Sequence, residues 1–466
     1  MKNFLVITLT AFLIFFGSWF ILYKYNINSL PIQSQDTLPA LFTPISIIKH
    51  GNIYLDDYSQ FMLESYPNPD DLDRVLGLTP FYLRKVATHY VTAFPLITPL
   101  LALPIYVFPV LMHMPITWDN LAILGHLSGA LILALSGGFL YLILKDIYKL
   151  DAKRIWILLA IYLFGTINFA LVSQGMWQHG TLELFIILGL YFVLSYYHQT
   201  PKDTYLFLGG LFFGLAVLSR PTAGLVLLFI LGFIGVHSLK NISLLVKRYL
   251  VFGLGLLPCV LFFVLYNGLF YGNIENQGYA SQIFTNWLSP FPLSFFGVWF
   301  SPSKGILIYS PIFFFSLFGA YISFKSLFKK QTVAVSVSTQ FNILFTLIIL
   351  FHTLIISFWK HWFGGWSFGY RMSSDVIPFF ILLLIPYLQS AYFAKTKLVF
   401  YTLLGLSIFI EAVGLVYFDG VWHAAYDKGF VDTAWLWSVK DSEFVFYIRR
   451  VLVKLHVLTK ACPTCL

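Results

Sequence analysis

The sequence predicts an all-α polytopic membrane protein with about 11 transmembrane helices and a large first extracytoplasmic loop. Of its 466 residues, 59% are hydrophobic and 11% are charged, whereas an ordinary soluble domain has about 25% charged residues. The mean hydropathy is +0.80. Apolar residues recur in blocks of roughly twenty, the length that crosses about 30 Å of hydrocarbon as a helix. These observations exclude a soluble globular protein, a disordered chain and a disulfide scaffold.

Eleven apolar blocks are expected to form the spanning helices. The first block shows no small-residue cleavage signature before Lys24, so we interpret it as a retained helix rather than a removed signal peptide. The predicted spans are 4–23, 119–144, 154–172, 180–197, 205–219, 223–239, 249–271, 305–324, 340–358, 376–393 and 398–418.

One apolar stretch, 94–114, is excluded from the spans because it contains four prolines, Pro95, Pro99, Pro104 and Pro109. Each proline removes a helical donor and leaves a backbone carbonyl without its partner, which is costly in lipid. We therefore expect an interfacial or broken helix outside the membrane core.

The distribution of charge supports this choice. With the stretch excluded, 14 basic residues fall on the predicted inner side against three acids, Asp146, Asp151 and Asp203. Including the stretch would invert this positive-inside bias. The net charge of +9 is therefore interpreted as a topology signal rather than as a nucleic-acid site. The basic residues are Lys2, Lys145, Lys149, Lys153, Arg154, Lys202, Lys240, Lys247, Arg248, Lys325, Lys329, Lys330, Lys395 and Lys397.

The resulting plan has two parts. Residues 1–418 form the membrane domain, whose first outer loop is 24–118, and residues 419–466 form an extracytoplasmic tail with a segment, 444–458, that could be an interfacial helix. The protein is expected in the cell membrane with a cytoplasmic N-terminus. Since the unusual polar residues gather in the outer loops, function is expected on the extracytoplasmic face.

The first outer loop contains two candidate acids. Asp36 could be a general base that takes a proton from an acceptor hydroxyl, or it could cap a helix that starts near Leu38. Asp57, with Asp56, could bind a polar substrate or a cation, or could lie in a solvated turn. The acidic run at 70–73 is interpreted as a solvated face.

Polar residues also mark the later outer loops. Trp177 and His179 lie in a short boundary loop, and Glu183 follows His179 by four residues, so the two could hydrogen-bond on one helix face. Arg220, which precedes Pro221, could be a phosphate ligand or could snorkel towards lipid headgroups.

The last two outer loops add Tyr279, Lys304 and Arg371. Arg371 could pair with Asp375, four residues further on, or join Arg220 and Lys304 in a cationic patch. The cysteines Cys462 and Cys465 form a C-x-x-C pair near the C-terminus, which alone is a weak indication of metal binding.

The chain resembles the GT-C superfamily of integral membrane glycosyltransferases, especially the RgtA/B/C/D-like and protein-mannosyltransferase-like group. The residues that carry the resemblance are Ser34–Thr37 with Leu55–Asp57, Ser173–Gly180, Ser219–Thr222, Trp299–Gly305 and Trp362–Arg371. The resemblance implies a GT-C fold with membrane-parallel helices in the first outer loop. It also implies inverting sugar transfer from a polyprenyl-phosphate donor in cell-envelope glycan biosynthesis, with Asp36 as the catalytic base.

The family often has two adjacent acids at this point, whereas Thr37 follows Asp36 here. No cofactor is expected, and the question of a divalent metal stays open. In the hypothesis, Arg220, Lys304 or Arg371 stabilises the departing phosphate, and Asp57, Trp177, His179, Glu183 and Tyr279 contact the substrates. The partners would be the lipid-linked donor, a glycan, lipid or protein acceptor, and the bilayer.

Two other classes remain open. A transporter or flippase for a lipid-linked or small polar substrate would place polar groups through the membrane midplane, where Glu411 is the clearest candidate. A non-catalytic membrane scaffold would not need the acids of the outer loops.

Overall fold

The computed structural model describes residues 2–28, 30–65, 80–199, 201–272, 287, 289–328 and 336–461. This part of the chain is helical apart from loops and one antiparallel hairpin, β1 (Leu83–Val86) with β2 (His89–Thr92), in which Leu83 pairs with Thr92. The predicted all-α class is confirmed with this small exception. Tyr90 also donates its backbone N–H to Asp56, which attaches the hairpin to α3 (Asp56–Ser65).

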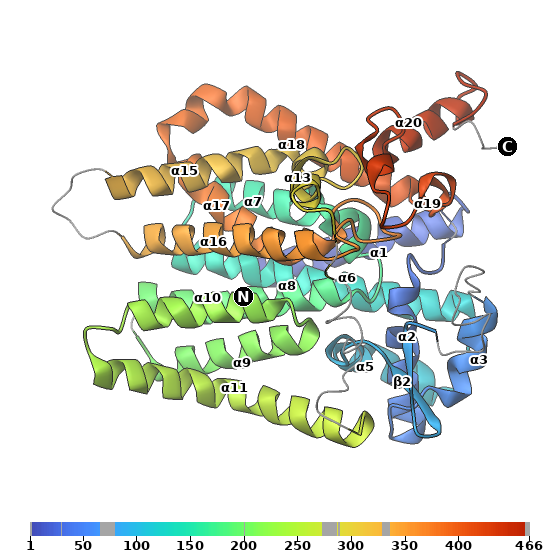
Figure 1. Cartoon of the computed structure of the whole chain (residues 1–466), viewed down its shortest axis with the longest axis horizontal. Helices are drawn as coiled ribbons and strands as arrows, with labels where there is room; N and C mark the ends of the chain where they lie inside the picture. The colour runs from blue at the N-terminus through green and yellow to red at the C-terminus, as the bar shows by residue number, and fades with distance from the viewer. Residues whose placement is uncertain are drawn as a thin grey trace.

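Seven stretches in the described residues are long and apolar enough to cross a membrane: Lys2–Lys24, Trp118–Ile147, Gln178–His198, Ile242–Phe270, Val337–Phe358, Arg371–Gln389 and Ala391–Tyr417. They contain the helices α1 (Lys2–Lys24), α6 (Trp118–Leu142), α8 (Gln178–His198), α11 (Ile242–Phe270), α16 (Val337–Phe358), α17 (Ile377–Gln389) and α18 (Ala391–Tyr417). The architecture is that of a multi-pass helical membrane protein (Figure 1).

The other four predicted spans are also helical but shorter or interrupted. Blocks 205–219 and 223–239 form α9 (Asp203–Ser219) and α10 (Ala223–Val236). Block 154–172 is broken at Gly165 between α7 (Ala152–Phe164) and a π-helical turn, η3 (Asn168–Val172). The count of eleven crossings therefore stays a prediction.

Block 305–324 is divided by a proline. It forms α14 (Ile306–Tyr309), a 3-10 turn η4 (Pro311–Phe313) and then α15 (Phe314–Phe328). Proline lacks the N–H that a continuous helix needs and disfavours helical backbone at the residue before it, here Ser310.

The excluded proline-rich stretch forms α5 (Ile97–Leu111), a helix that accommodates Pro104 and Pro109. Fifteen residues rise only about 22 Å at 1.5 Å per residue, less than the roughly 30 Å of hydrocarbon. Figure 1 shows α5 end-on beside long helices that run across the view. Its placement at a membrane surface stays a prediction.

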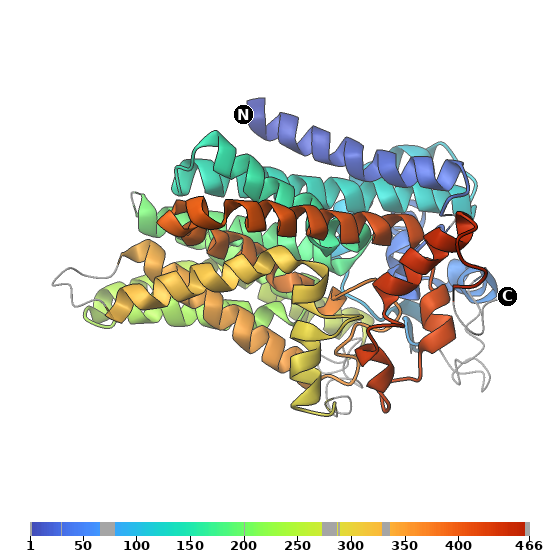
Figure 2. The same cartoon turned by 90° about the horizontal axis from the view of Figure 1, so that it is seen from above.

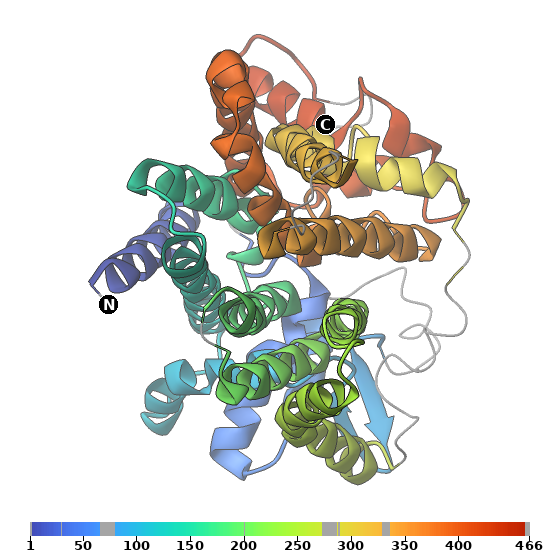
Figure 3. The ribbon, with the colours of Figure 1, turned by 90° about the vertical axis from the view of Figure 1, so that its left-hand side faces the viewer.

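The bundle has a buried centre and exposed flanks. In α8 and in the Arg371–Gln389 stretch, 83% of the apolar window is buried, against 28% in α1 and 17% in α11. Figure 3, in which the helices are seen largely from their ends, places α1 and α11 at different edges of the bundle. The exposed apolar side chains of these two helices suit contact with lipid.

Glycine allows α9 and α11 to approach closely. A Cβ added at Gly255 would lie 2.0 Å from the backbone oxygen of Phe207, and one added at Gly210 would lie 2.1 Å from that of Phe252. Backbone atoms block both positions, so a side chain can fit only if the helices separate.

We expect Gly255→Ala to lower the free energy of unfolding by about 1–3 kcal/mol because it overpacks this contact. The matched control is Gly253→Ala on the same helix, where a Cβ would meet nothing within 4 Å. This control should be neutral or stabilising, since alanine is the better helix former. Thermal unfolding of both variants in one detergent measures the difference, and equal midpoints would contradict the packing argument.

The two ends of the bundle differ. The connections α6–α7, α8–α9, α10–α11 and α17–α18, all predicted as inner and basic, lie at the left-hand end in Figure 1. The right-hand end carries α2 (Leu38–His50), α3, the hairpin, α19 (Val421–Tyr426) and α20 (Glu443–Lys454). Figure 2 shows α13 (Leu293–Phe300) crossing the direction of the long helices beside the ends of α15 and α16. Which end faces the cytoplasm stays a prediction.

Candidate functional site

The candidate site is centred on an ion pair between Asp36 and Arg371. Arg371 donates from Nη1 to Oδ2 of Asp36 at 2.5 Å, and the two side chains are 12% and 28% exposed, respectively. Asp36 lies in the 3-10 turn η1 (Gln35–Thr37), and Arg371 begins η5 (Arg371–Val376). The pair joins the first predicted outer loop to the last one and leaves the carboxylate partly exposed to solvent.

Asp36 does not cap the following helix. Ser34 accepts the backbone N–H of Asp36 at 3.3 Å and so caps η1, while Thr37 is the N-cap of α2 without a side-chain hydrogen bond. The interpretation of Asp36 as a helix cap is therefore wrong. Among the described residues its side chain contacts only Arg371, so one carboxylate oxygen, Oδ1, is left without a hydrogen bond.

The ring of Trp177 packs against the guanidinium of the ion pair. The guanidinium carbon of Arg371 lies 5.0 Å from the centre of the Trp177 ring, within cation–π range. The indole N–H of Trp177 donates to Gln33 Oε1 at 3.3 Å, and Gln33 in turn donates to the Ala170 carbonyl at 3.0 Å. The segment that bears Asp36 is thus attached to the loop that bears Trp177.

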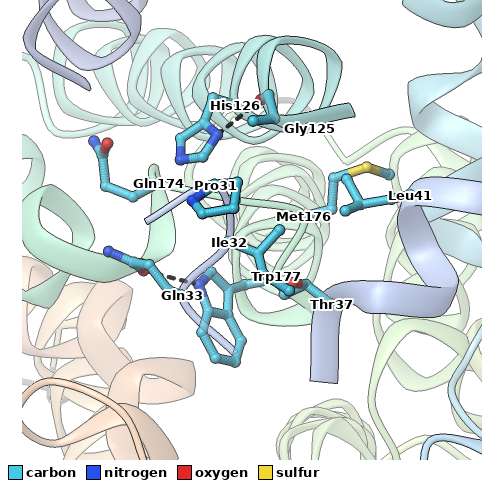
Figure 4. A pocket seen from close by; sticks show the side chains of 12 residues that line it. Pro31, Ile32, Gln33, Thr37, Leu41, Gly125, His126, Gln174, Met176 and Trp177 are labelled. Carbon is cyan, nitrogen blue, oxygen red and sulfur yellow. Dashed lines mark hydrogen bonds between the residues drawn. The ribbon is translucent and has the colours of Figure 1, made fainter. Parts of the chain in front are cut away.

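Two small adjoining cavities open next to this arrangement. The first is lined by Gln33, Thr37 and Trp177 among others (Figure 4), and the second is lined by Trp19, Asn28 and Leu415 among others. Gln33, His126 and Gln174 line both cavities. His126 Nδ1 lies 2.8 Å from the Ala122 carbonyl, so this nitrogen is the donor and Nε2 can accept a hydrogen bond.

Arg220 belongs to a second, more deeply buried cluster. Its Nε lies 3.5 Å from Oδ2 of Asp375, and its Nη1 is hydrogen-bonded to His179 Nε2. The same Asp375 oxygen accepts from Thr222 at 2.8 Å and lies 3.4 Å from His352 Nε2. The expected pairing of Arg371 with Asp375 is therefore wrong. A 3-10 segment has three residues per turn, so residues four apart in η5 do not share a face.

Glu183 has a different partner from the one expected. Its Oε2 accepts from Asn168 Nδ2 at 3.0 Å, and the side chain is fully buried in α8. The predicted hydrogen bond to His179 is wrong because His179 turns to Arg220 instead.

Lys304 has a buried acidic partner of its own. It is fully buried, and its Nζ lies 3.2 Å from Oε2 of Glu443 and 3.1 Å from Nε2 of His423. Burial lowers the pKa of Lys304 and raises that of Glu443, and the attraction between the two opposes both shifts. The predicted cationic patch is therefore not formed as expected, because Arg220 and Lys304 each have a buried acidic partner.

The remaining candidates are peripheral or undescribed. Asp57 is 68% exposed and lies 3.2 Å from His50 Nε2, so it is solvated as expected, but it stands in the first turn of α3 rather than in a turn between elements. Tyr279, Cys462, Cys465 and the acidic run at 70–73 lie outside the described residues. Within the part that is described, no three His, Cys, Asp or Glu side chains gather where they could hold a metal ion.

Sequence reasoning missed His361 and Gln33. His361 lies in the loop 359–370, and the charges of both Asp36 and Arg371 act on it. Gln33 connects Trp177 to the backbone beside Asp36. The sequence could have indicated His361, because this histidine lies in an aromatic, glycine-rich loop that ends at Arg371. It could not have indicated Gln33, because the contact of Gln33 depends on the folding of distant segments.

His361 predicts sensitivity to acid. Burial and the nearby Lys360 and Arg371 lower its pKa from 6.5 to about 4. Below pH 6.5 the unfolded chain binds a proton that the folded chain does not accept until about pH 4, so the free energy of unfolding falls across this window as the pH drops. His361→Gln should flatten this part of the profile. Thermal unfolding between pH 4 and 7 measures it, and identical slopes would contradict the assignment.

The fold and the site together define a multi-pass helical membrane protein with a partly open carboxylate–guanidinium pair at one end of its bundle. No family model, curated protein sequence or solved structure matches the chain.

Proposed function

We propose that the protein is a membrane glycosyltransferase that moves a sugar from a polyprenyl-phosphate donor to an acceptor, with Asp36 as the base. The observation that carries this proposal is the ion pair between Asp36 and Arg371, which leaves the carboxylate 28% exposed. A carboxylate that is held in place and still reachable meets the geometric requirement for taking a proton from a hydroxyl.

In the proposed reaction, an acceptor hydroxyl gives its proton to Asp36 as its oxygen attacks the anomeric carbon. The bond from that carbon to the phosphate oxygen breaks with inversion, and the polyprenyl phosphate leaves with increased negative charge. Arg371, beside Asp36, is the cation best placed to stabilise that charge. Arg220 and Lys304 are less suited to this role because both are buried and so less accessible to a donor phosphate than Arg371.

The surroundings of the pair support a lipid-linked donor. The predicted outer loops converge on this end of an apolar bundle, and the exposed apolar faces of α1 and α11 can accommodate a prenyl tail. The buried ring of Trp177 lies beside the pair and holds the guanidinium of Arg371 near Asp36.

The direct test is an activity screen. The full chain, purified into lipid nanodiscs, is incubated with polyprenyl-phosphate sugars of several kinds and a set of hydroxyl acceptors, with and without a divalent cation. Release of polyprenyl phosphate that depends on the acceptor is the expected result. If no donor is consumed at any acceptor concentration, while the protein remains folded, the proposal fails.

A transporter or flippase is the second candidate, and Glu411 favours it. Glu411 is fully buried in α18, and neither of its carboxyl oxygens has a hydrogen-bond partner among the described residues. Ionisable groups inside membrane helices often mark transport pathways. Reconstituted vesicles distinguish the candidates, since a flippase moves the lipid-linked sugar between leaflets without releasing polyprenyl phosphate.

A further inference from the structure

Glu443, the first residue of α20, accepts three hydrogen bonds at one carboxylate oxygen. Its Oε2 accepts from Lys304 Nζ at 3.2 Å, from Tyr309 OH at 3.1 Å and from the backbone N–H of Gly369 at 3.1 Å. The side chains of Glu443 and Lys304 are both 0% exposed. An acid from the C-terminal tail is therefore fixed inside the membrane domain, and one of its bonds reaches the backbone two residues before Arg371.

The loop 359–370 is shaped to make this bond. Gly369 has a φ of +58°, and a Cβ there would lie 2.9 Å from the ring of Tyr309. Only glycine combines this backbone conformation with so close an approach. Lys304 also donates from Nζ to the Ser367 carbonyl. Both members of the buried pair thus hold the segment 367–369.

Other contacts place the tail across the same loop. The indole N–H of Trp366 donates to Asp427 Oδ2 at 2.8 Å, and the Trp366 ring stacks on His423 with ring centres 5.6 Å apart. Lys360 Nζ lies 4.6 Å from the centre of the Phe430 ring. These contacts are nearer the surface, so the buried Glu443–Lys304 pair is the part of the tail that fixes the loop most firmly.

We propose that Glu443 is a positioning residue that holds the loop 359–370 so that Arg371 meets Asp36. The structural part of this inference stands on the bonds to Gly369 and Ser367, and its catalytic part rests on the proposed function. Loss of the carboxylate would release the Gly369 N–H and let the start of η5 shift, which would separate the guanidinium from Asp36 without removing either group.

The test compares two carboxyl-to-amide changes on the tail. Glu443→Gln weakens the three hydrogen bonds of Glu443, including the one to Gly369. The control Asp419→Asn weakens the ion pair of Asp419 with Arg450, at 2.7 Å. That ion pair also holds α20 but does not contact the loop. Glu443→Gln should raise hydrogen exchange at 366–371 about tenfold or more because the segment opens locally. Asp419→Asn should leave this exchange within about twofold of that of the unchanged protein.

Activity gives the second measurement. Misplacing Arg371 should lower kcat by about 10–100-fold with little change in the donor KM, since the lost interaction acts mainly in the transition state. A purely structural role would instead reduce the folded fraction and leave kcat per folded molecule unchanged, and that result would overturn the proposal.

Glu443→Gln leaves Lys304 buried without a counter-charge and could prevent folding. The double variant Lys304→Met/Glu443→Met removes both charges at similar volume and also removes the bonds to Ser367 and Gly369. It should fold, and it should show the faster exchange at 366–371. A folded double variant with unchanged exchange would refute the positioning role. Faster exchange in the variant, together with no transferase activity in the unchanged protein, would refute only the proposed function.

Discussion

Replacing Asp36 by asparagine is expected to lower the rate of the proposed sugar transfer by about 10²–10⁴-fold, the usual contribution of a general base. The amide has nearly the same shape as the carboxylate and its oxygen can still accept from Arg371, so the contact between the two loops is retained. It cannot take a proton from the acceptor hydroxyl. The folded state should persist, because Asp36 is partly exposed and an ion pair of this kind contributes modestly to stability.

Asp119→Asn is the matched control for this change. Asp119 is an exposed carboxylate in the first turn of α6, and its hydrogen bond from Tyr23 OH can be retained by asparagine. Polyprenyl phosphate release by the unchanged protein and the two variants, normalised to the folded fraction, measures the effect. Turnover by Asp36→Asn at the rate of the control would remove Asp36 from the mechanism.

Asp375→Asn should lower the free energy of unfolding by about 3–5 kcal/mol. Asparagine can still accept from Thr222, so the change isolates the charge. Arg220, which is 8% exposed, would keep its guanidinium in a buried site with no acidic partner. Thermal unfolding in a single detergent measures the loss.

The double variant Arg220→Met/Asp375→Asn separates the missing charge from a packing defect. If the uncompensated guanidinium causes the loss, removing it should restore more than half of the stability. A double variant that is less stable than Asp375→Asn alone would show that Arg220 stabilises the fold through its contact with His179 instead.

The helices were predictable because apolar block length is a local property. Each predicted block is helical, and the stretch 94–114 forms the short helix α5, whose exclusion from the spans stays a prediction. The breaks at Gly165 and Pro311 were missed because a block can be apolar throughout while its helical backbone hydrogen bonds are interrupted.

The partners within the site were less predictable. Asp36 and Arg371 were both singled out, but the local alternative, Asp375 four residues from Arg371, was the obvious pairing by spacing. The observed pair is 335 residues apart in the sequence. Glu443 was not singled out at all, because an acid at the start of an amphipathic helix is ordinarily a surface residue. Only the folding of the tail over Lys304 buries it.

The distance along the chain between Asp36 and Arg371 also orders events during synthesis. At about 5–20 residues per second, roughly 20–70 s separate the translation of the two residues, and Glu443 follows later still. A nascent chain therefore inserts most of its helices before the carboxylate acquires its guanidinium partner. A ribosome that stalls earlier would leave an inserted protein without the pair in the bilayer, so any activity that needs the pair begins only after Arg371 has been made.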